Sequence, residues 1–194
     1  MPSDAAGDAD RELTAVDLRR AVIARQRLAE RSNDPLPAVL DAVGGLQAQY
    51  APSMYIGCWS RLADFHRDRL TDDLHARRVV QGTLLRATIH LVSPTDYWPL
   101  SRAVRRARRR WWERARRTAS APEMEAAAER VRDALAEAGE LSRQELEAVA
   151  GPGRAADVGL FIDLVRVPPS GTWERRRADR YAAAETWIGP KPDR

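Results

Sequence analysis

Two stretches rich in β-branched and apolar residues constrain the fold of this chain more than any other feature, because each follows a run of helix signals. The first stretch, VVQGTLLRATIHLV at residues 79–92, reads as strand, short turn and strand, which predicts a β-hairpin. The helical segments before it cover residues 14–31, 36–43, a segment that begins at Pro52, and residues 71–78. Helices followed by a hairpin are typical of a winged helix, in which a helix-turn-helix unit carries an added hairpin.

The second stretch repeats this order. Helices are predicted over residues 122–138 and 141–151, and the apolar run from Leu160 to Val167 is interpreted as a helix that leads into a hairpin around PPSGTWER. We therefore predict a mainly α fold with small β-hairpins, built from tandem winged-helix units. The predicted boundaries are a tail at 1–10, a first winged helix at 11–95, a connecting helix at 96–120 and a second winged helix at 121–190.

The connecting helix has an unusual distribution of charge and tryptophan. Eight arginines lie between residues 105 and 117, where the one acidic residue is Glu113. On a helical wheel, one stripe is apolar and the opposite stripe is basic. The apolar stripe contains Leu100, Val104, Ala107, Trp111 and Ala115, and the basic stripe contains Arg102, Arg105, Arg109 and Arg116, beside Trp112. This phase predicts that Trp111 lies in the core and that Trp112 does not.

The basic residues are concentrated in the middle of the chain. Residues 61–117 contain 15 arginines and 6 acidic residues, a net charge of +9, although the whole sequence carries only +4. Like charges on neighbouring helical turns repel each other, and phosphates would neutralise them and release counterions. We therefore favour contact with nucleic acid. A solvated basic face and an anionic membrane surface are the alternatives.

Further arginines lie where winged helices meet phosphates or the minor groove. Arg86 is near the tip of the first predicted hairpin, and three consecutive arginines follow the turn of the second, where a solvated hairpin end is an equal alternative. The residues predicted to contact DNA are Arg86, Arg102, Arg105, Arg106, Arg109, Arg116, Arg175, Arg176 and Arg177.

Several classes of function find no support in the sequence. It contains no phosphate-binding glycine loop, dinucleotide fingerprint or zinc-protease motif, and Thr71-Asp72 is interpreted as a helix cap, not as part of a metal site. The single cysteine, Cys58, excludes an intrachain disulfide and a cysteine-built zinc site. No apolar run reaches membrane-spanning length, and the acidic N-terminus is unlike a signal peptide. We expect a cytoplasmic, nucleoid-associated protein without a metal or cofactor.

Three segments together resemble one known family. GLQAQYAPS, LLRATIHLVSPTDYW and VRVPPSGTWERRR with TWIG are similar to the winged-helix proteins of the AlkZ-like, azinomycin-resistance DNA glycosylase family, from about residue 13 to 190. The resemblance implies a monofunctional glycosylase that excises alkylated or crosslinked purines from double-stranded DNA without a cofactor. Its Gln–apolar–Gln signature falls on Gln47 and Gln49, a pair that is uninformative by itself. A glutamine amide can orient water but cannot act as a base, which suits a cationic alkylpurine that leaves readily.

The sequence departs from the family pattern in one respect. Family chains continue beyond PPSGTW into a third winged helix, whereas this sequence ends at Arg194, so we expect the third unit to be absent. The alternative to a glycosylase is therefore a non-catalytic DNA-binding protein, either a transcription regulator or a remnant of the family.

Overall fold

The structure, a computed structural model, describes residues 12–115, 119–175 and 178–192, and it repeats one order of elements. After a leading helix α1 (Ala15–Arg25), the first half contains α2 (Leu36–Val43), β1 (Leu46–Gln47), α3 (Ala51–Trp59), α4 (Arg67–His75), β2 (Val80–Thr83), the 3-10 turn η1 (Leu85–Ala87) and β3 (Ile89–Val92). The second half contains α5 (Pro94–Ala115), α6 (Ala121–Ala138), β4 (Leu141–Ser142), α7 (Arg143–Ala150), the 3-10 turn η2 (Val158–Leu160), β5 (Leu164–Arg166), β6 (Arg180–Ala183) and α8 (Ala184–Ile188).

The six strands of the described residues join in one antiparallel sheet in the order β1-β3-β2-β5-β6-β4. In each half a short strand pairs with the second strand of the hairpin, so the order has the same pattern from either end. The halves meet where β2 pairs with β5, with Gln81 opposite Arg166. The predicted mainly α fold with small hairpins is confirmed. The division into two winged-helix units at residues 11–95 and 121–190 stays an interpretation, and the predicted tail at 1–10 lies outside the described residues.

Two local predictions are wrong. The run from Leu160 to Val167 contains strand β5 instead of a helix, and its hairpin partner is β6 at 180–183 rather than the TWER segment. Val165 is completely buried in the middle of the sheet, and a short apolar run of this kind has no periodicity that separates strand from helix. Helix α4 begins at Arg67, so Thr71-Asp72 lies inside it and does not cap it.

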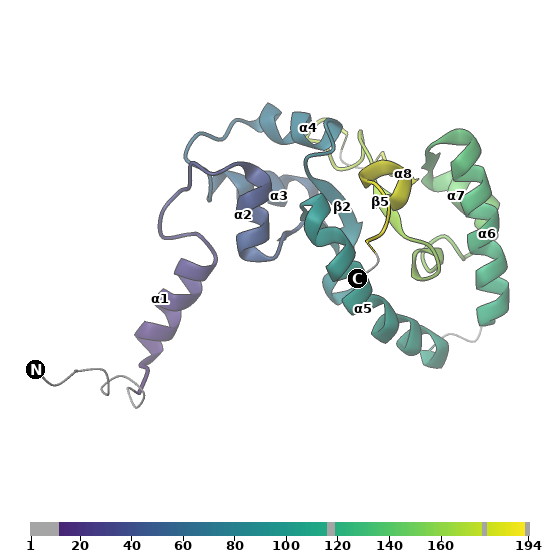
Figure 1. Ribbon diagram of the computed structural model, residues 1–194, viewed down its shortest axis with the longest axis horizontal. Helices are drawn as coiled ribbons and strands as arrows, with labels where there is room; N and C mark the ends of the chain where they lie inside the picture. The colour runs from purple at the N-terminus through teal and green to yellow at the C-terminus, as the bar shows by residue number, and fades with distance from the viewer. Residues whose placement is uncertain (1–11, 116–118, 176–177, 193–194) are drawn as a thin grey trace, which may run out of the picture.

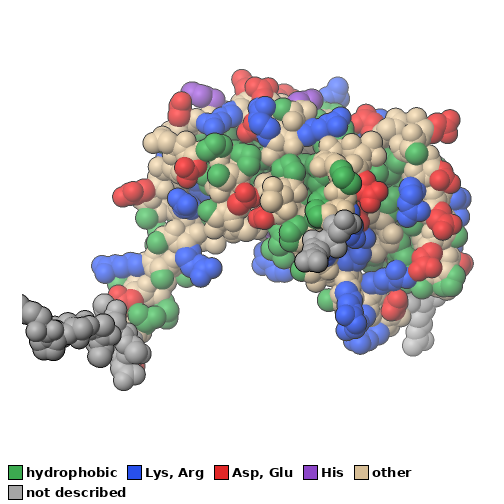
Figure 2. All heavy atoms as spheres, viewed as in Figure 1, with side chains coloured by type: hydrophobic (Ala, Val, Ile, Leu, Met, Phe, Trp, Pro, Cys, Tyr) green, Lys and Arg blue, Asp and Glu red, His purple; other side chains and the backbone are tan. Residues whose placement is uncertain are grey.

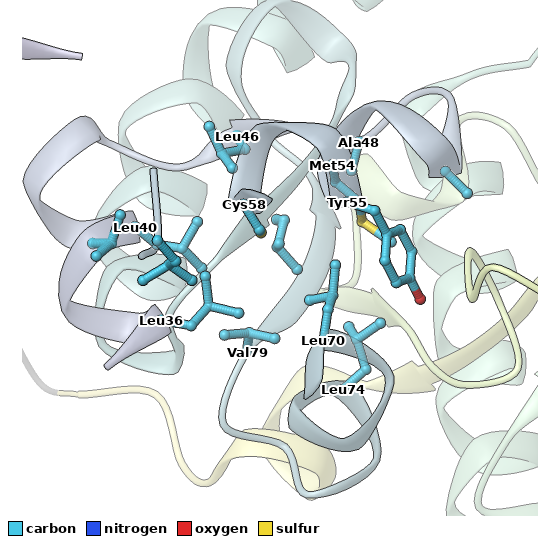
Figure 3. Packing of buried hydrophobic residues seen from close by; sticks show 14 residues of the cluster. Leu36, Leu40, Leu46, Ala48, Met54, Tyr55, Cys58, Leu70, Leu74 and Val79 are labelled. Carbon is cyan, nitrogen blue, oxygen red and sulfur yellow. The ribbon is translucent and has the colours of Figure 1, made fainter. Parts of the chain in front are cut away.

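Three groups of buried side chains stabilise the fold. The first lies among α2, α3 and α4 and includes Leu40, Met54 and Leu70 (Figure 3). The second joins α6 and α7 to the end of α5, and the third packs the start of α5 against the central strands. Tyr97 also donates a hydrogen bond from its hydroxyl to the backbone oxygen of Leu164 at 3.1 Å, which fixes α5 to β5.

Helix α1 stands apart from these groups. A capping box between Thr14 and Asp17 begins this helix, but none of the helix residues is buried. Its apolar stripe is exposed, and the helix projects from the rest of the molecule (Figures 1 and 2).

The predicted phase of α5 is wrong at its tryptophans. Trp111 is 66% exposed, whereas Trp112 is 2% exposed and packs edge-on against Phe161, with ring centroids 5.2 Å apart. The inward stripe of α5 contains polar residues: the hydroxyl of Ser101 donates to Asp163 at 2.8 Å, and Arg105 bonds to the same carboxylate. A pattern search for apolar residues cannot detect such a stripe.

Replacement of each tryptophan tests this phase. Trp112→Ala should lower the free energy of unfolding by about 3–5 kcal/mol, because it opens a cavity in the second buried group. Trp111→Ala should cost less than about 1 kcal/mol, as surface substitutions do. Urea titration of both variants measures the difference, and an equal or reversed loss would show that α5 is rotated about its axis.

The turn at Gly171 depends on the absence of a side chain. Its φ is +68°, and a Cβ there would lie 2.5 Å from Oε1 of Gln81, which is itself held by a 3.1 Å hydrogen bond from Nε2 to the backbone oxygen of Ser170. Gly171→Ala should therefore cost about 2–5 kcal/mol, from backbone strain together with overpacking.

Gly153→Ala is the matched control, because Gly153 has a φ of +72° but no atom within 4 Å of the added Cβ. Backbone strain alone should cost about 1–2 kcal/mol there. Urea titration should rank Gly171→Ala clearly below the control in stability, and equal losses would refute the predicted clash with Gln81.

Candidate functional site

The segment that contains Gln47 and Gln49 is fixed by the glycines before it. Gly44 ends α2 in the left-handed conformation, with φ of 73°. A Cβ on Gly45 would lie 2.6 Å from Cγ1 of Val92, so the chain can lie this close to β3 only as glycine. The segment then pairs with β3 as β1.

Gln49 completes the hydrogen bonding of the strand. The backbone nitrogen of Ala48 donates to the oxygen of Ile89 at 2.7 Å, and the nitrogen of Ile89 donates to Oε1 of Gln49 at 3.0 Å. The side-chain oxygen thus takes the place of a backbone carbonyl. No further hydrogen bond of this side chain is found among the described residues, so its second lone pair and the two hydrogens on Nε2 are left for another partner.

Gln47 has a different environment. It lies opposite His90 of β3 and is exposed, and no side-chain hydrogen bond is found for it within the part of the chain that the structure describes. His90 is 5% exposed, and its Nδ1 lies 3.0 Å from the backbone oxygen of Thr88. The buried imidazole of His90 thus lies opposite an exposed Gln47, whose amide makes no hydrogen bond among the described residues.

A hollow of about 310 Å³ opens beside Gln49. We call it the glutamine hollow; its lining residues are Ala48, Gln49, Ala51, Ile89, Arg166, Gly171 and Asp179. Asp179 is its single carboxylate among the described residues, and this carboxylate bonds to Arg166. Burial lowers the pKa of Arg166, which is 9% exposed. The ion pair neutralises much of the charge that Asp179 would otherwise present to a ligand.

The structure divides the predicted DNA-contact arginines of α5 into two groups. Arg105 bonds to Asp163, and Arg109 bonds to Glu125 and lies over the ring of Phe161 at 4.4 Å. Acids distant in the sequence therefore neutralise part of this helix. Arg106 is exposed and Arg102 is half-buried, and no carboxylate lies within salt-bridge distance of either one in the described parts of the chain. Figure 2 shows acidic side chains along the edge of the molecule where α6 lies.

Two other predicted arginines lie on the connections between hairpin strands. Arg86 is in η1, at the tip between β2 and β3, with a φ of 53°. Arg175 is exposed in the connection between β5 and β6. Arg116, Arg176 and Arg177 lie outside the described residues.

Sequence reasoning missed four charged residues that the fold brings close to these sites. Asp179 and Arg166 border the glutamine hollow, and Arg108 and Arg143 line a second hollow with Arg105 and Arg166. They come from α5, α7, β5 and the segment before β6. No motif links them, because the pairing of β4 and β5 with β6 and the packing of α5 against the sheet bring them together.

The described residues contain no group of three or more histidine, cysteine or acidic side chains that could hold a metal ion. A search of the same residues for a helix long and apolar enough to cross a bilayer also gives no candidate.

The chain is similar to known proteins in both sequence and fold. The family model for DNA glycosylase AlkZ-like proteins matches residues 40–194, a range that includes Gln47 and Gln49. The DNA glycosylase AlkZ of Streptomyces sahachiroi has the same fold, with a TM-score of 0.69 and 18% identity over 89% of this chain and 50% of that one. This chain thus spans about half the length of that protein. No curated protein matches. Since the family model covers most of the sequence, the chain belongs to the AlkZ-like DNA glycosylase family.

Proposed function

We propose that this protein binds double-stranded DNA and hydrolyses the N-glycosyl bond of alkylated purines, including crosslinked ones, at Gln47 and Gln49. The observation that carries the proposal is the Gln-Ala-Gln segment, which lies beside a hollow within the range matched by the family model. The hydrolysis would take place in the cytoplasm, on the DNA of the nucleoid.

The chemistry available at the site suits a leaving group that departs easily. N-glycosyl cleavage passes through an oxocarbenium-like sugar, which water then attacks. Neither amide can remove a proton from water at neutral pH, but each can orient it by donating and accepting hydrogen bonds. A purine alkylated at N7 or N3 is already cationic and leaves as a neutral base, so orientation of water is sufficient.

The hydrogen bond from Ile89 gives Gln49 a defined role in this proposal. It fixes the plane of the amide, so that the remaining lone pair of Oε1 and the Nε2 group point in set directions. A water molecule in the glutamine hollow could then be oriented without loss of side-chain entropy in the reaction. Gln47, which has no such bond, would steady the sugar or share the water.

One observation favours the second candidate, a DNA-binding protein without catalytic activity. The carboxylate in the glutamine hollow, Asp179, is bonded to Arg166 and is therefore poorly suited to support a cationic sugar. DNA affinity is expected of both candidates, so release of a base distinguishes them.

Gln49→Ala should slow release of N7-methylguanine from duplex DNA by about 10- to 1,000-fold, the range for loss of an orienting polar group. Gln47→Ala should act in the same direction. DNA affinity should hardly change, because a neutral amide contributes little to phosphate binding. Single-turnover release and equilibrium binding measure the two effects separately.

Gln144→Ala is the control, because Gln144 is an exposed glutamine on α7 that does not line the glutamine hollow. It should release the base at the wild-type rate. If wild type binds DNA but releases no base, the non-catalytic candidate holds. If the Gln47→Ala/Gln49→Ala double variant keeps full activity, the assignment of the two glutamines is wrong.

A further inference from the structure

A second hollow, separate from Gln47 and Gln49, is lined by four guanidinium groups. Arg105 and Arg108 reach it from α5, Arg143 from the start of α7, and Arg166 from β5. It has a volume of about 110 Å³, and no carboxylate is among its described lining residues. We call it the arginine hollow.

The positive charge in this hollow exceeds the negative charge around it. Asp163 bonds to Arg105 but also lies 3.9 Å from Lys191, and Asp179 bonds to Arg166. The guanidinium of Arg143 has no hydrogen bond or ion pair in the segments that the structure describes. Nε of Arg166 is buried, and no hydrogen-bond partner for it is found among the described residues. One cation and one buried donor are therefore left for an anion.

Burial makes this arrangement costly without a ligand. Burial lowers the pKa of Arg105, and the nearby charge of Arg108 lowers it further. Burial also lowers the pKa of Arg108, and the charge of Asp157 partly opposes that shift. Arg108 donates one hydrogen bond, to the backbone oxygen of Thr83 at 2.9 Å. Guanidinium groups crowded in this way are stabilised when a phosphate accepts their hydrogen bonds.

The arginine hollow continues into an apolar groove. The two share Thr83, Val104, Arg108, Ala156 and Leu160, and the groove adds Ala103, Ala107 and Trp111, with Arg86 and Asp157 also among its lining residues. The volume of this Trp111 groove is about 640 Å³. Trp111 is 66% exposed although it is a large apolar ring on a basic helix. Such a ring beside a phosphate site offers a surface on which a base can stack.

We propose that the arginine hollow and the Trp111 groove together bind one nucleotide unit of a DNA strand. The phosphate lies among the guanidinium groups of Arg105, Arg108, Arg143 and Arg166, and the attached sugar and base lie against Trp111. This inference rests on the DNA binding in the proposed function and does not depend on base excision.

Replacement of Arg108 and Arg143, for which no salt bridge is found among the described residues, tests the phosphate position. The Arg108→Ala/Arg143→Ala double variant should bind duplex DNA about 10-fold or more weakly at 0.1 M salt, and the plot of log affinity against log salt should be flatter by about one unit, as expected for one lost phosphate contact. The matched control is Arg19→Ala/Arg20→Ala, which removes the same charge from exposed positions on α1. Equal slopes in the two double variants would overturn the phosphate site.

Replacement of the ring tests the other half of the site by a different measurement. Trp111→Ala should weaken DNA binding about 5- to 100-fold and leave the salt slope unchanged, because the lost contact is uncharged. Trp59→Ala removes a comparably exposed tryptophan on α3, 53% exposed, and should bind DNA like wild type. Equal affinities of the two tryptophan variants would overturn the base position.

Inorganic phosphate tests whether the arginine hollow binds free phosphate or the phosphate of a DNA strand. Millimolar phosphate, compared with chloride at equal ionic strength, should raise the melting temperature of wild type but not of the Arg108→Ala/Arg143→Ala variant. If phosphate stabilises wild type alone while the DNA slopes of both double variants agree, the hollow takes free phosphate instead of DNA. If wild type binds no DNA, the proposed function fails. The melting temperatures still test the phosphate site in that case. Equal phosphate-induced shifts in wild type and the Arg108→Ala/Arg143→Ala variant, or no shift in either, would overturn it.

Discussion

The pairing of β2 with β5 is the contact on which the rest of the structure depends. Two residue pairs, Gln81 with Arg166 and Gly82 with Val165, join the hairpin of one half to the hairpin of the other. Each hairpin by itself would have an unpaired edge, and two-stranded hairpins are at best marginally stable in water. The junction converts them into a six-stranded sheet. It also brings Arg166 between the glutamine hollow and the arginine hollow, so both sites are built on the same strand.

The polar stripe of α5 explains how a helix with this charge density packs against the sheet. Tyr97, Ser101 and Arg105 occupy successive turns, and each bonds to β5 or to the residue before it. Buried polar groups are tolerated when their hydrogen bonds are satisfied. The helix therefore presents arginines both inward and outward, and its apolar anchors lie at its ends, at Trp98 and Trp112.

The sequence predicted most helices and the first hairpin, but not the contacts between these elements. Side-chain caps such as Ser93 at α5 and Ser142 at α7 are local, because each accepts a hydrogen bond from the backbone nitrogen three residues on. The glutamine pair could be selected only through family resemblance, since two glutamines in a turn have no pattern of their own. The phase of α5, strand β5 and the partners of Arg105 and Gln49 all depend on contacts between residues more than 35 positions apart, which no local periodicity encodes.

The hydrogen bond between Ile89 and Gln49 gives the hairpin a mechanical connection to the amide. Ile89 is three residues from Arg86 at the hairpin tip, and both Arg86 and Ala87 have a positive φ, which non-glycine residues adopt at a cost in energy. The strained tip and the donor that orients Gln49 therefore lie within the same four residues, 86–89. Arg86 and Ala87 also line the Trp111 groove, so one short turn connects that groove with the strand that bonds to the amide.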